Sequence, residues 1–426
     1  MRRTGQGSEG GAGPRPLPGL AAVRESACGY WQRRGLPTEP AQVAVAPAAP
    51  LLLLAVLAAA GRRERPGAAG VLLPHPCTSW YAPQAHLLGQ PVRTVPVPAE
   101  CGGVPDPFAL LETVRRARAA GEAPRALVLS MADDVTGTAA PPELLHEVCE
   151  AAVAEDLLLV SDETWRDSSH AADDTVVVSP AQMLAEAGRP EQVVVLADLG
   201  AALPQPDLRA GVARFSATRG GELLGEQVNE VLGLLGSGLS ERTAAAAVTA
   251  LSEPAELRSR RAADARRHGW LAGLLHGAVT EAGATCRPPH VGRHVYADLD
   301  QLRTRLAARG IADAPALEAE LVRRLGPYAV GGHRFGDDPR ELRVRLSTGA
   351  LSGAPPHPSA TAAVAPTTAT VTGPAATAAG PADAGSVPGA RQWGPAELGA
   401  RESAGAAEAL AQVQSVLADL TDGSSH

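Results

Sequence analysis

The sequence contains no lysine, so all 38 of its basic side chains are arginine. An arginine guanidinium stays protonated in proteins and cannot act as a neutral primary amine. Chemistry that needs a lysine amine as nucleophile is therefore excluded at every position of the chain. Aromatic residues are also scarce, at 3%. We therefore expect a core that is packed with small aliphatic side chains.

The chain carries few cysteines and no excess of positive charge. The five cysteines are odd in number and far apart, without a Cys-x-x-Cys pair or a Cys/His cluster at zinc spacing. This pattern predicts reduced, buried thiols in a cytoplasmic protein and no metal site. The formal net charge of −8 argues against broad nucleic-acid binding, which needs a basic face.

One long apolar run, residues 43–60, has the composition of a membrane span. Pro47 and Pro50 interrupt it, and the segment before them, residues 42–46, is typical of a short buried strand. We therefore predict a strand, a turn and a core helix here, and no membrane association.

Short apolar segments alternate with segments of helical periodicity through the first half of the chain. The expected strands are residues 42–46, Gly70–Leu73, Pro91–Pro98, Arg125–Ser130, Leu157–Val160 and Val193–Leu196. This order predicts an α/β fold with a doubly wound mixed sheet in a large domain. In such sheets, ligands bind beyond the carboxyl ends of the strands. Further along the chain, long helices are expected over Gly221–Gly236 and Arg242–Gly269, and the shorter helices and strands that follow predict a smaller α+β domain.

The expected domain boundaries follow from these patterns and from composition. They are a disordered tail at 1–18, an amino-terminal helix and arm of the small domain at 19–46, the large domain at 47–240, the small domain at 241–352, a disordered insertion at 353–395 and a carboxy-terminal helix of the small domain at 396–426. The insertion is Ala, Thr, Pro and Gly with almost no charge, so it cannot bury enough apolar surface to offset its ordering entropy.

Residues 193–211 read VVVLADLGAALPQPDLRAG, an apolar strand followed by a small-residue turn and Leu-Arg-Ala-Gly. The segment resembles the lysine segment of class I/II aminotransferases, which are pyridoxal-phosphate enzymes of fold type I. Their pattern is roughly Ser-x-Ser-Lys, a spacer, and Gly-Leu-Arg-x-Gly. Counting back from Arg209 places Asp198 and Gly200 on the two serines and Ala201 on the Schiff-base lysine. The resemblance therefore implies a cofactor site with no catalytic residue.

Two further segments resemble the parts of this family that hold the cofactor ring. Asp162, in Ser-Asp-Glu-Thr-Trp, matches the aspartate that pairs with the pyridine nitrogen, and Trp165 stands on the tyrosine that donates to the ring oxygen. Asp134, before Val-Thr-Gly, stands on the asparagine that donates to the same oxygen. Counted from Pro76, Thr78 takes the place of the aromatic that stacks on the ring, and Trp80 or Tyr81 could take it only with a shifted loop. A carboxylate donates no hydrogen bond unless it is protonated.

Further residues of this chain stand where the family binds the phosphate group of the cofactor and the carboxylate of the substrate. Ala49, before the 51–60 helix, stands where the family holds phosphate with a hydroxyl and helix amides, and Pro50 removes one amide. Asp198 brings a negative charge to the same place, whereas Arg209 matches the phosphate-pairing arginine. Arg345, in LRVRL, best matches the arginine that binds the substrate carboxylate through two parallel hydrogen bonds, and Arg343, two residues earlier on the same strand face, is the weaker candidate.

Three functions stay open at this point. The resemblance implies an aminotransferase that moves an amino group between an amino acid and a 2-oxo acid. The missing lysine favours a degenerate, non-catalytic member that binds pyridoxal phosphate weakly and non-covalently, or that uses the fold to bind a partner. A lysine-independent pyridoxal-phosphate enzyme is the third. We expect a small-molecule amino acid or 2-oxo acid as ligand and a homodimer, or a heterodimer with an active relative.

Overall fold

The structure, a computed structural model, describes residues 18–62, 67–98, 101–171, 177–202, 208–353 and 400–421. The tail expected at 1–18, apart from Pro18, lies outside these residues. So does the insertion expected at 353–395, apart from Gly353.

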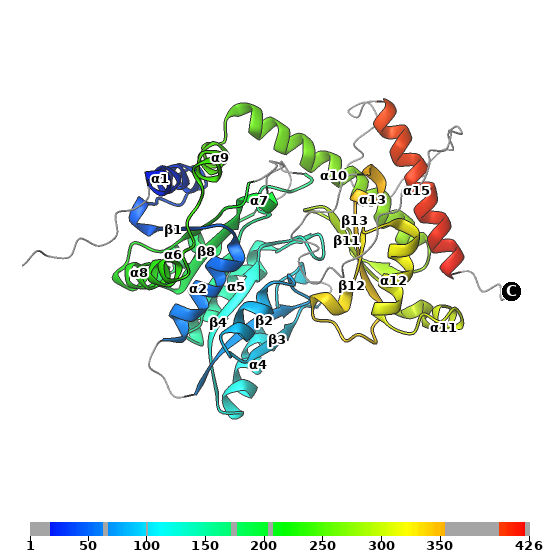
Figure 1. Cartoon of the computed structure of the whole chain (residues 1–426). Coiled ribbons are helices and arrows are strands. Elements are labelled where there is room, and N and C mark those ends of the chain that lie inside the picture. The colour runs from blue at the N-terminus through cyan, green and yellow to red at the C-terminus, as the bar shows by residue number, and fades with distance from the viewer. Residues whose placement is uncertain are drawn as a thin grey trace, which may run out of the picture.

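A seven-stranded mixed sheet forms the centre of the large domain (Figure 1). Its order is β1 (Val43–Ala46), β9 (Gly211–Arg214), β8 (Val193–Asp198), β7 (Leu158–Asp162), β4 (Glu122–Ser130), β2 (Ala68–His75) and β3 (Val92–Pro96). β9 pairs antiparallel with both of its neighbours, whereas the pairs from β8 to β3 are parallel. The predicted doubly wound mixed sheet is confirmed.

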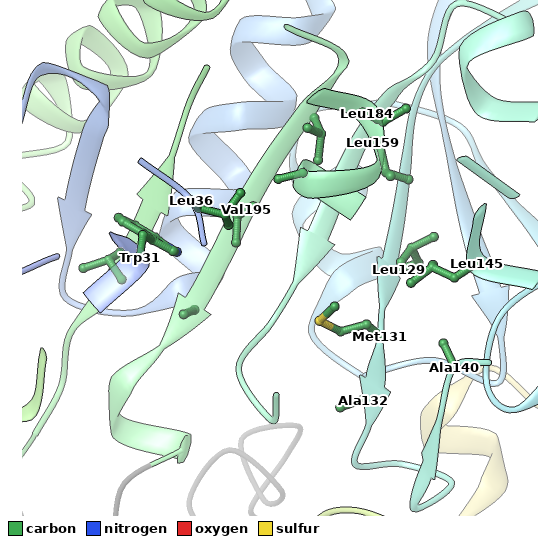
Figure 2. Close-up of a cluster of buried hydrophobic side chains, with 14 of the residues drawn as sticks. Trp31, Leu36, Leu129, Met131, Ala132, Ala140, Leu145, Leu159, Leu184 and Val195 are labelled. Atoms are coloured by element: carbon green, nitrogen blue, oxygen red, sulfur yellow. The ribbon is translucent and has the colours of Figure 1, made fainter. Parts of the chain in front are cut away.

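Helices cover both faces of this sheet because successive strand residues point to opposite sides. In β4, Leu127 and Leu129 pack into one buried cluster, whereas Ala126 and Val128 pack into the other. The first face holds α1 (Pro18–Gln32), α4 (Pro107–Ala119), α5 (Pro142–Ala154), α6 (Pro180–Glu186) and α9 (Glu241–Ser252), and the second holds α2 (Ala49–Gly61), α3 (Tyr81–Leu87) and α8 (Arg219–Leu234). Figure 2 shows Trp31, Leu145 and Leu184 beside strand residues of the first cluster.

The small domain is built on a four-stranded antiparallel sheet. Its order is β10 (Thr285–Cys286), β11 (His294–Asp298), β13 (Arg343–Ser347) and β12 (Ala329–Gly331), and its helices are α10 (Ala255–Glu281), α11 (Arg303–Ala308), α12 (Ala314–Leu325), α13 (Gly349–Ser352) and α15 (Ala400–Thr421). Minor elements are α7 (Leu199–Ala202), the β5–β6 hairpin (Ala132–Asp133, Thr138–Ala139) and the short 3-10 helices η1 (Pro40–Gln42), η3 (Pro190–Gln192), η4 (Asp300–Leu302) and η5 (Gly332–Phe335). In Figure 1, α10 runs from the large domain to the small one.

Two expectations about organisation are wrong. Residues 19–46 belong to the large domain, because β1 pairs with β9 and α1 packs against α9. The single helix expected over Arg242–Gly269 is two helices: Glu253, with a φ of 49°, and Pro254 separate α9 from α10. Because α9 packs in the large-domain core, the small domain begins after it.

The expected strand, turn and core helix over residues 43–60 are present as β1 and α2. Among the residues that the structure describes, no helix has both the length and the apolar character that a membrane span needs. No disulfide bond joins any of the five cysteines. Cys101 and Cys149 are buried as expected, whereas Cys28, Cys77 and Cys286 are only half-buried.

The carboxy-terminal helix docks on the small domain as expected. Val413, Val416, Leu417 and Leu420 of α15 lie in the same buried cluster as residues of β11 and β13.

We predict that Leu417→Ala lowers the free energy of unfolding by about 2–5 kcal/mol, the usual cost of truncating a buried leucine. Urea denaturation measures it. Leu234→Ala, at a residue that is 78% exposed, is the matched control and should leave the urea midpoint unchanged; equal effects of the two variants would contradict docking of α15.

Candidate functional site

A cavity of about 350 Å³ lies at the carboxyl ends of the parallel strands, between the two domains. Seven of the nine residues singled out from the sequence line it. They are Thr78, Asp134, Asp162, Trp165, Asp198, Ala201 and Arg345. Strand ends bring the first six together, because β2, β4, β7 and β8 all end at this edge of the sheet. The volume suits a small organic ligand.

Asp134 is held by the small domain. Its Oδ2 lies 2.9 Å from Nδ1 of His294, and its Oδ1 accepts the N–H of Arg293 at 3.1 Å. Burial alone would raise the pKa of Asp134, but His294, Arg345 and the Arg293 amide outweigh burial, so the pKa is lowered. Asp134 is therefore a carboxylate that accepts hydrogen bonds at neutral pH.

Asp162 follows β7 and is also buried. The hydroxyl of Tyr81 donates to its Oδ2 at 2.7 Å, and the N–H of Thr164 donates to its Oδ1 at 3.0 Å. Burial raises the pKa of Asp162, and these two donors act in the opposite direction. Both of its oxygens already have a donor within the chain.

Asp198 occupies the amino-terminal end of α2. Its Oδ2 accepts the N–H of Ala49 at 3.1 Å, and its Oδ1 accepts the N–H of Ala201 at 3.0 Å. Gly211 allows this arrangement, since a Cβ there would come within 2.6 Å of the Ala49 nitrogen. Helix amino termini attract anions. At α2, the chain provides that anion itself.

Arg345 is the cationic group of the cavity. Its side chain is 5% exposed, and its guanidinium carbon lies 4.6 Å from the centre of the Phe335 ring. Its Nε is buried without a hydrogen-bond partner, and no ion pair or hydrogen bond joins the Arg345 side chain to another residue that the structure describes. Burial lowers the pKa of Arg345, and the charge of Asp134 opposes that effect.

Contacts at the end of β2 hold the small domain in place beside the cavity. The Cys77 N–H donates to the carbonyl of Phe335 at 3.1 Å, and Nε2 of His75 lies 3.2 Å from Oδ1 of Asp337. His75 and Asp337 also group with Glu341. Arg343 reaches Asp337 at 3.2 Å and Glu341 at 2.8 Å, so a guanidinium already neutralises these carboxylates.

The expectation that Arg209 faces this cavity is wrong. Arg209 is exposed, whereas its neighbours Leu208 and Ala210 are buried, and it is not among the residues that line the cavity. The alternation of an extended segment turns it to the outside. Ala49 does not line the cavity either; it contributes only its amide, to Asp198.

The sequence profile described as aminotransferase class I and II matches residues 10–352. The chain belongs to this family. No curated protein sequence matches it.

Solved aminotransferases share the fold of this family member. Aspartate aminotransferase from Thermus thermophilus, in a structure with maleate, is 23% identical with a TM-score of 0.62, covering 77% of each chain. Aspartate aminotransferase from Rhizobium meliloti is 19% identical with a TM-score of 0.64, again covering 77% of each chain. N-succinyldiaminopimelate aminotransferase from Mycobacterium tuberculosis is 23% identical with a TM-score of 0.62, over 78% of this chain and 80% of that one.

The residues of the cavity do not fit the pyridoxal phosphate that the family implies. Ala201 has no amine, and the chain has no lysine that could replace it. The amide of Ala49 is bonded to Asp198, and a phosphate placed there would meet that carboxylate. Two like charges 4 Å apart repel by about 4 kcal/mol at an effective dielectric constant near 20. With Arg209 outside the cavity, the matched phosphate partners are all lost.

Two side chains of the site were missed from the sequence. Tyr81 was considered only as a ring that could stack on a cofactor, yet its hydroxyl binds Asp162. His294 lies in a sequence pattern that indicates only a strand and no role in a site, yet it pairs with Asp134. Both contacts join segments that are far apart in the sequence, so no local sequence motif predicts them.

Proposed function

We propose that this family member is non-catalytic and holds a small carboxylic acid, an amino acid or a 2-oxo acid, on Arg345. The observation that supports this is the guanidinium itself, 5% exposed, stacked on Phe335 and without a carboxylate partner among the described residues. A buried charge is costly unless it is paired, so the position favours an anionic ligand. The Thermus aminotransferase of similar fold was solved with maleate, a dicarboxylate.

The same proposal assigns pyridoxal phosphate a weak and non-covalent role at most. Asp198 blocks the α2 terminus, and Tyr81 already donates to the carboxylate that would pair with the pyridine nitrogen. We expect cofactor added to the purified protein to absorb as free aldehyde and to wash out on dialysis.

Arg345→Met tests the carboxylate site. We expect it to weaken binding of the best amino or 2-oxo acid by about 100-fold, since losing a buried charge pair costs about 2–5 kcal/mol. Isothermal titration calorimetry measures the affinity. The melting temperature should hold or rise, because a buried unpaired charge is removed.

Arg340→Met is the matched control, since the Arg340 side chain is 85% exposed, and it should bind like wild type. If Arg345→Met binds the same acids as tightly as wild type, Arg345 is not the carboxylate anchor.

A further inference from the structure

The cavity is more acidic than a site for a simple anion requires. Among the residues that the structure describes, three carboxyl groups line it, those of Asp134, Asp162 and Asp198, against one guanidinium, that of Arg345. A 2-oxo acid would bring another negative charge into this space and could pair only with the guanidinium. An amino acid carries an ammonium group as well as a carboxylate, so it adds no net charge. The electrostatic balance of the lining favours the zwitterion.

Asp134 is the carboxylate best placed to receive that ammonium group. It is close enough to Arg345 for each charge to shift the pKa of the other, yet no hydrogen bond joins the two side chains. In an amino acid, one carbon separates the ammonium nitrogen from the carboxylate. A ligand with its carboxylate on Arg345 therefore places its ammonium group in the neighbourhood of Asp134.

His294 holds Asp134 in place beside the cavity. Burial lowers the pKa of His294, and the charge of Arg345 lowers it further, so the ring is neutral at pH 7. Its Nδ1 lies 2.9 Å from Oδ2 of Asp134, and a neutral imidazole in this position donates its Nδ1–H to the carboxylate. Asp134 therefore stays charged at the cavity wall, where it attracts an ammonium group but not a keto oxygen.

We propose that the cavity selects a free amino acid over the corresponding 2-oxo acid, with the ligand carboxylate on Arg345 and its α-ammonium group on Asp134. This inference rests on the proposed function, because it needs Arg345 as the carboxylate anchor. It adds the group that discriminates between the two ligands, which is the carboxylate of Asp134 held by His294.

Calorimetry on the full-length protein tests the selectivity. The twenty amino acids are titrated first, followed by matched pairs: alanine and pyruvate, glutamate and 2-oxoglutarate, leucine and 4-methyl-2-oxopentanoate, phenylalanine and phenylpyruvate. We expect the amino acid of the best pair to bind at least tenfold more tightly than its 2-oxo acid. Asp134→Asn should reduce that ratio at least fivefold and leave 2-oxo acid binding equal or tighter. Asp338→Asn, at an exposed carboxylate bound to Arg340, should keep the wild-type ratio.

The possible outcomes distinguish a failure of the proposed selectivity from a failure of the proposed carboxylate site on Arg345. Equal binding of both members of each pair, or tighter binding of the 2-oxo acid, overturns the selectivity and leaves the carboxylate site standing. No binding by any amino acid or 2-oxo acid overturns both. If a folded Asp134→Asn protein keeps the wild-type ratio of amino acid to 2-oxo acid affinity, Asp134 does not bind the ammonium group. If that variant does not fold, Asp134→Ser replaces it, and an unchanged ratio there overturns the proposed ammonium site.

Discussion

Wild-type protein mixed with pyridoxal phosphate, an amino acid and a 2-oxo acid is expected to yield no transamination product above the rate without protein. A transaminase needs a neutral amine to form the aldimine and to move the proton, and the chain has no lysine to provide one. A positioned proton-transfer group alone contributes about 10²–10⁴ in rate. Mass-spectrometric quantification of the new amino acid measures the result.

Restoring the amine by Ala201→Lys alone should not restore activity. Asp198 still occupies the amide of Ala49, and Asp134 still presents a carboxylate where the family has a donor. The combined variant Ala201→Lys, Asp198→Ser and Asp134→Asn should bind the cofactor and show an imine absorption band. Leu234→Lys, on the exposed side of α8, controls for non-specific imines. Full activity in the single Ala201→Lys variant would show that the two aspartates do not oppose the cofactor.

Glu253→Gln is expected to destabilise the protein by about 3 kcal/mol, because breaking a buried ion pair removes the carboxylate that three arginines share, and only Arg34 and Arg261 keep a second one, that of Asp167. Three arginines converge on this carboxylate: Arg33 at 2.9 Å, Arg34 at 2.6 Å and Arg261 at 2.7 Å. The Glu253 side chain is 3% exposed and that of Arg34 is 9% exposed. The cluster ties α1 to the junction of α9 and α10. Urea denaturation measures the loss.

The same group predicts a dependence of stability on pH. Burial alone would raise the pKa of Glu253, but the hydrogen bonds and charges of Arg34 and Arg261 lower it to about 2. The unfolded value is about 4.3. The carboxylate therefore contributes stability above that unfolded value, and the contribution is lost as the pH falls from about 4.3 through about 2. Wild type should lose more stability than Glu253→Gln over this interval.

Glu112→Ala serves as the control for both measurements. Glu112 pairs with Arg115 and Arg116 on the exposed side of α4, and its removal should leave the urea midpoint nearly unchanged. A Glu253→Gln protein as stable as this control would contradict the role of the buried cluster.

Most of the sheet could be predicted because each buried strand is a compact apolar run with a helix on either side. β9 was missed, since Gly211–Arg214 is short and is defined mainly by its partners. The domain membership of residues 19–46 also depends on that pairing. The division between α9 and α10 had a local signal in Pro254, and the helical periodicity on either side obscured it.

The site was predictable where it depends on strand ends and not where it depends on contacts between domains. Asp134, Asp162 and Ala201 converge because β4, β7 and β8 end at one edge. Arg209 was assigned from the motif alone, and a two-residue alternation places it outside. The link between Asp134 and His294 joins residues 160 positions apart, which no spacing rule anticipates.

The most direct test of the central claim, that this aminotransferase fold holds no cofactor through an imine, is borohydride reduction of the full-length protein with pyridoxal phosphate, followed by peptide mass mapping. We predict no pyridoxyl adduct on any peptide that lines the cavity and no retained cofactor after dialysis. A stable pyridoxyl adduct together with substantial turnover in the unmutated protein would contradict the account.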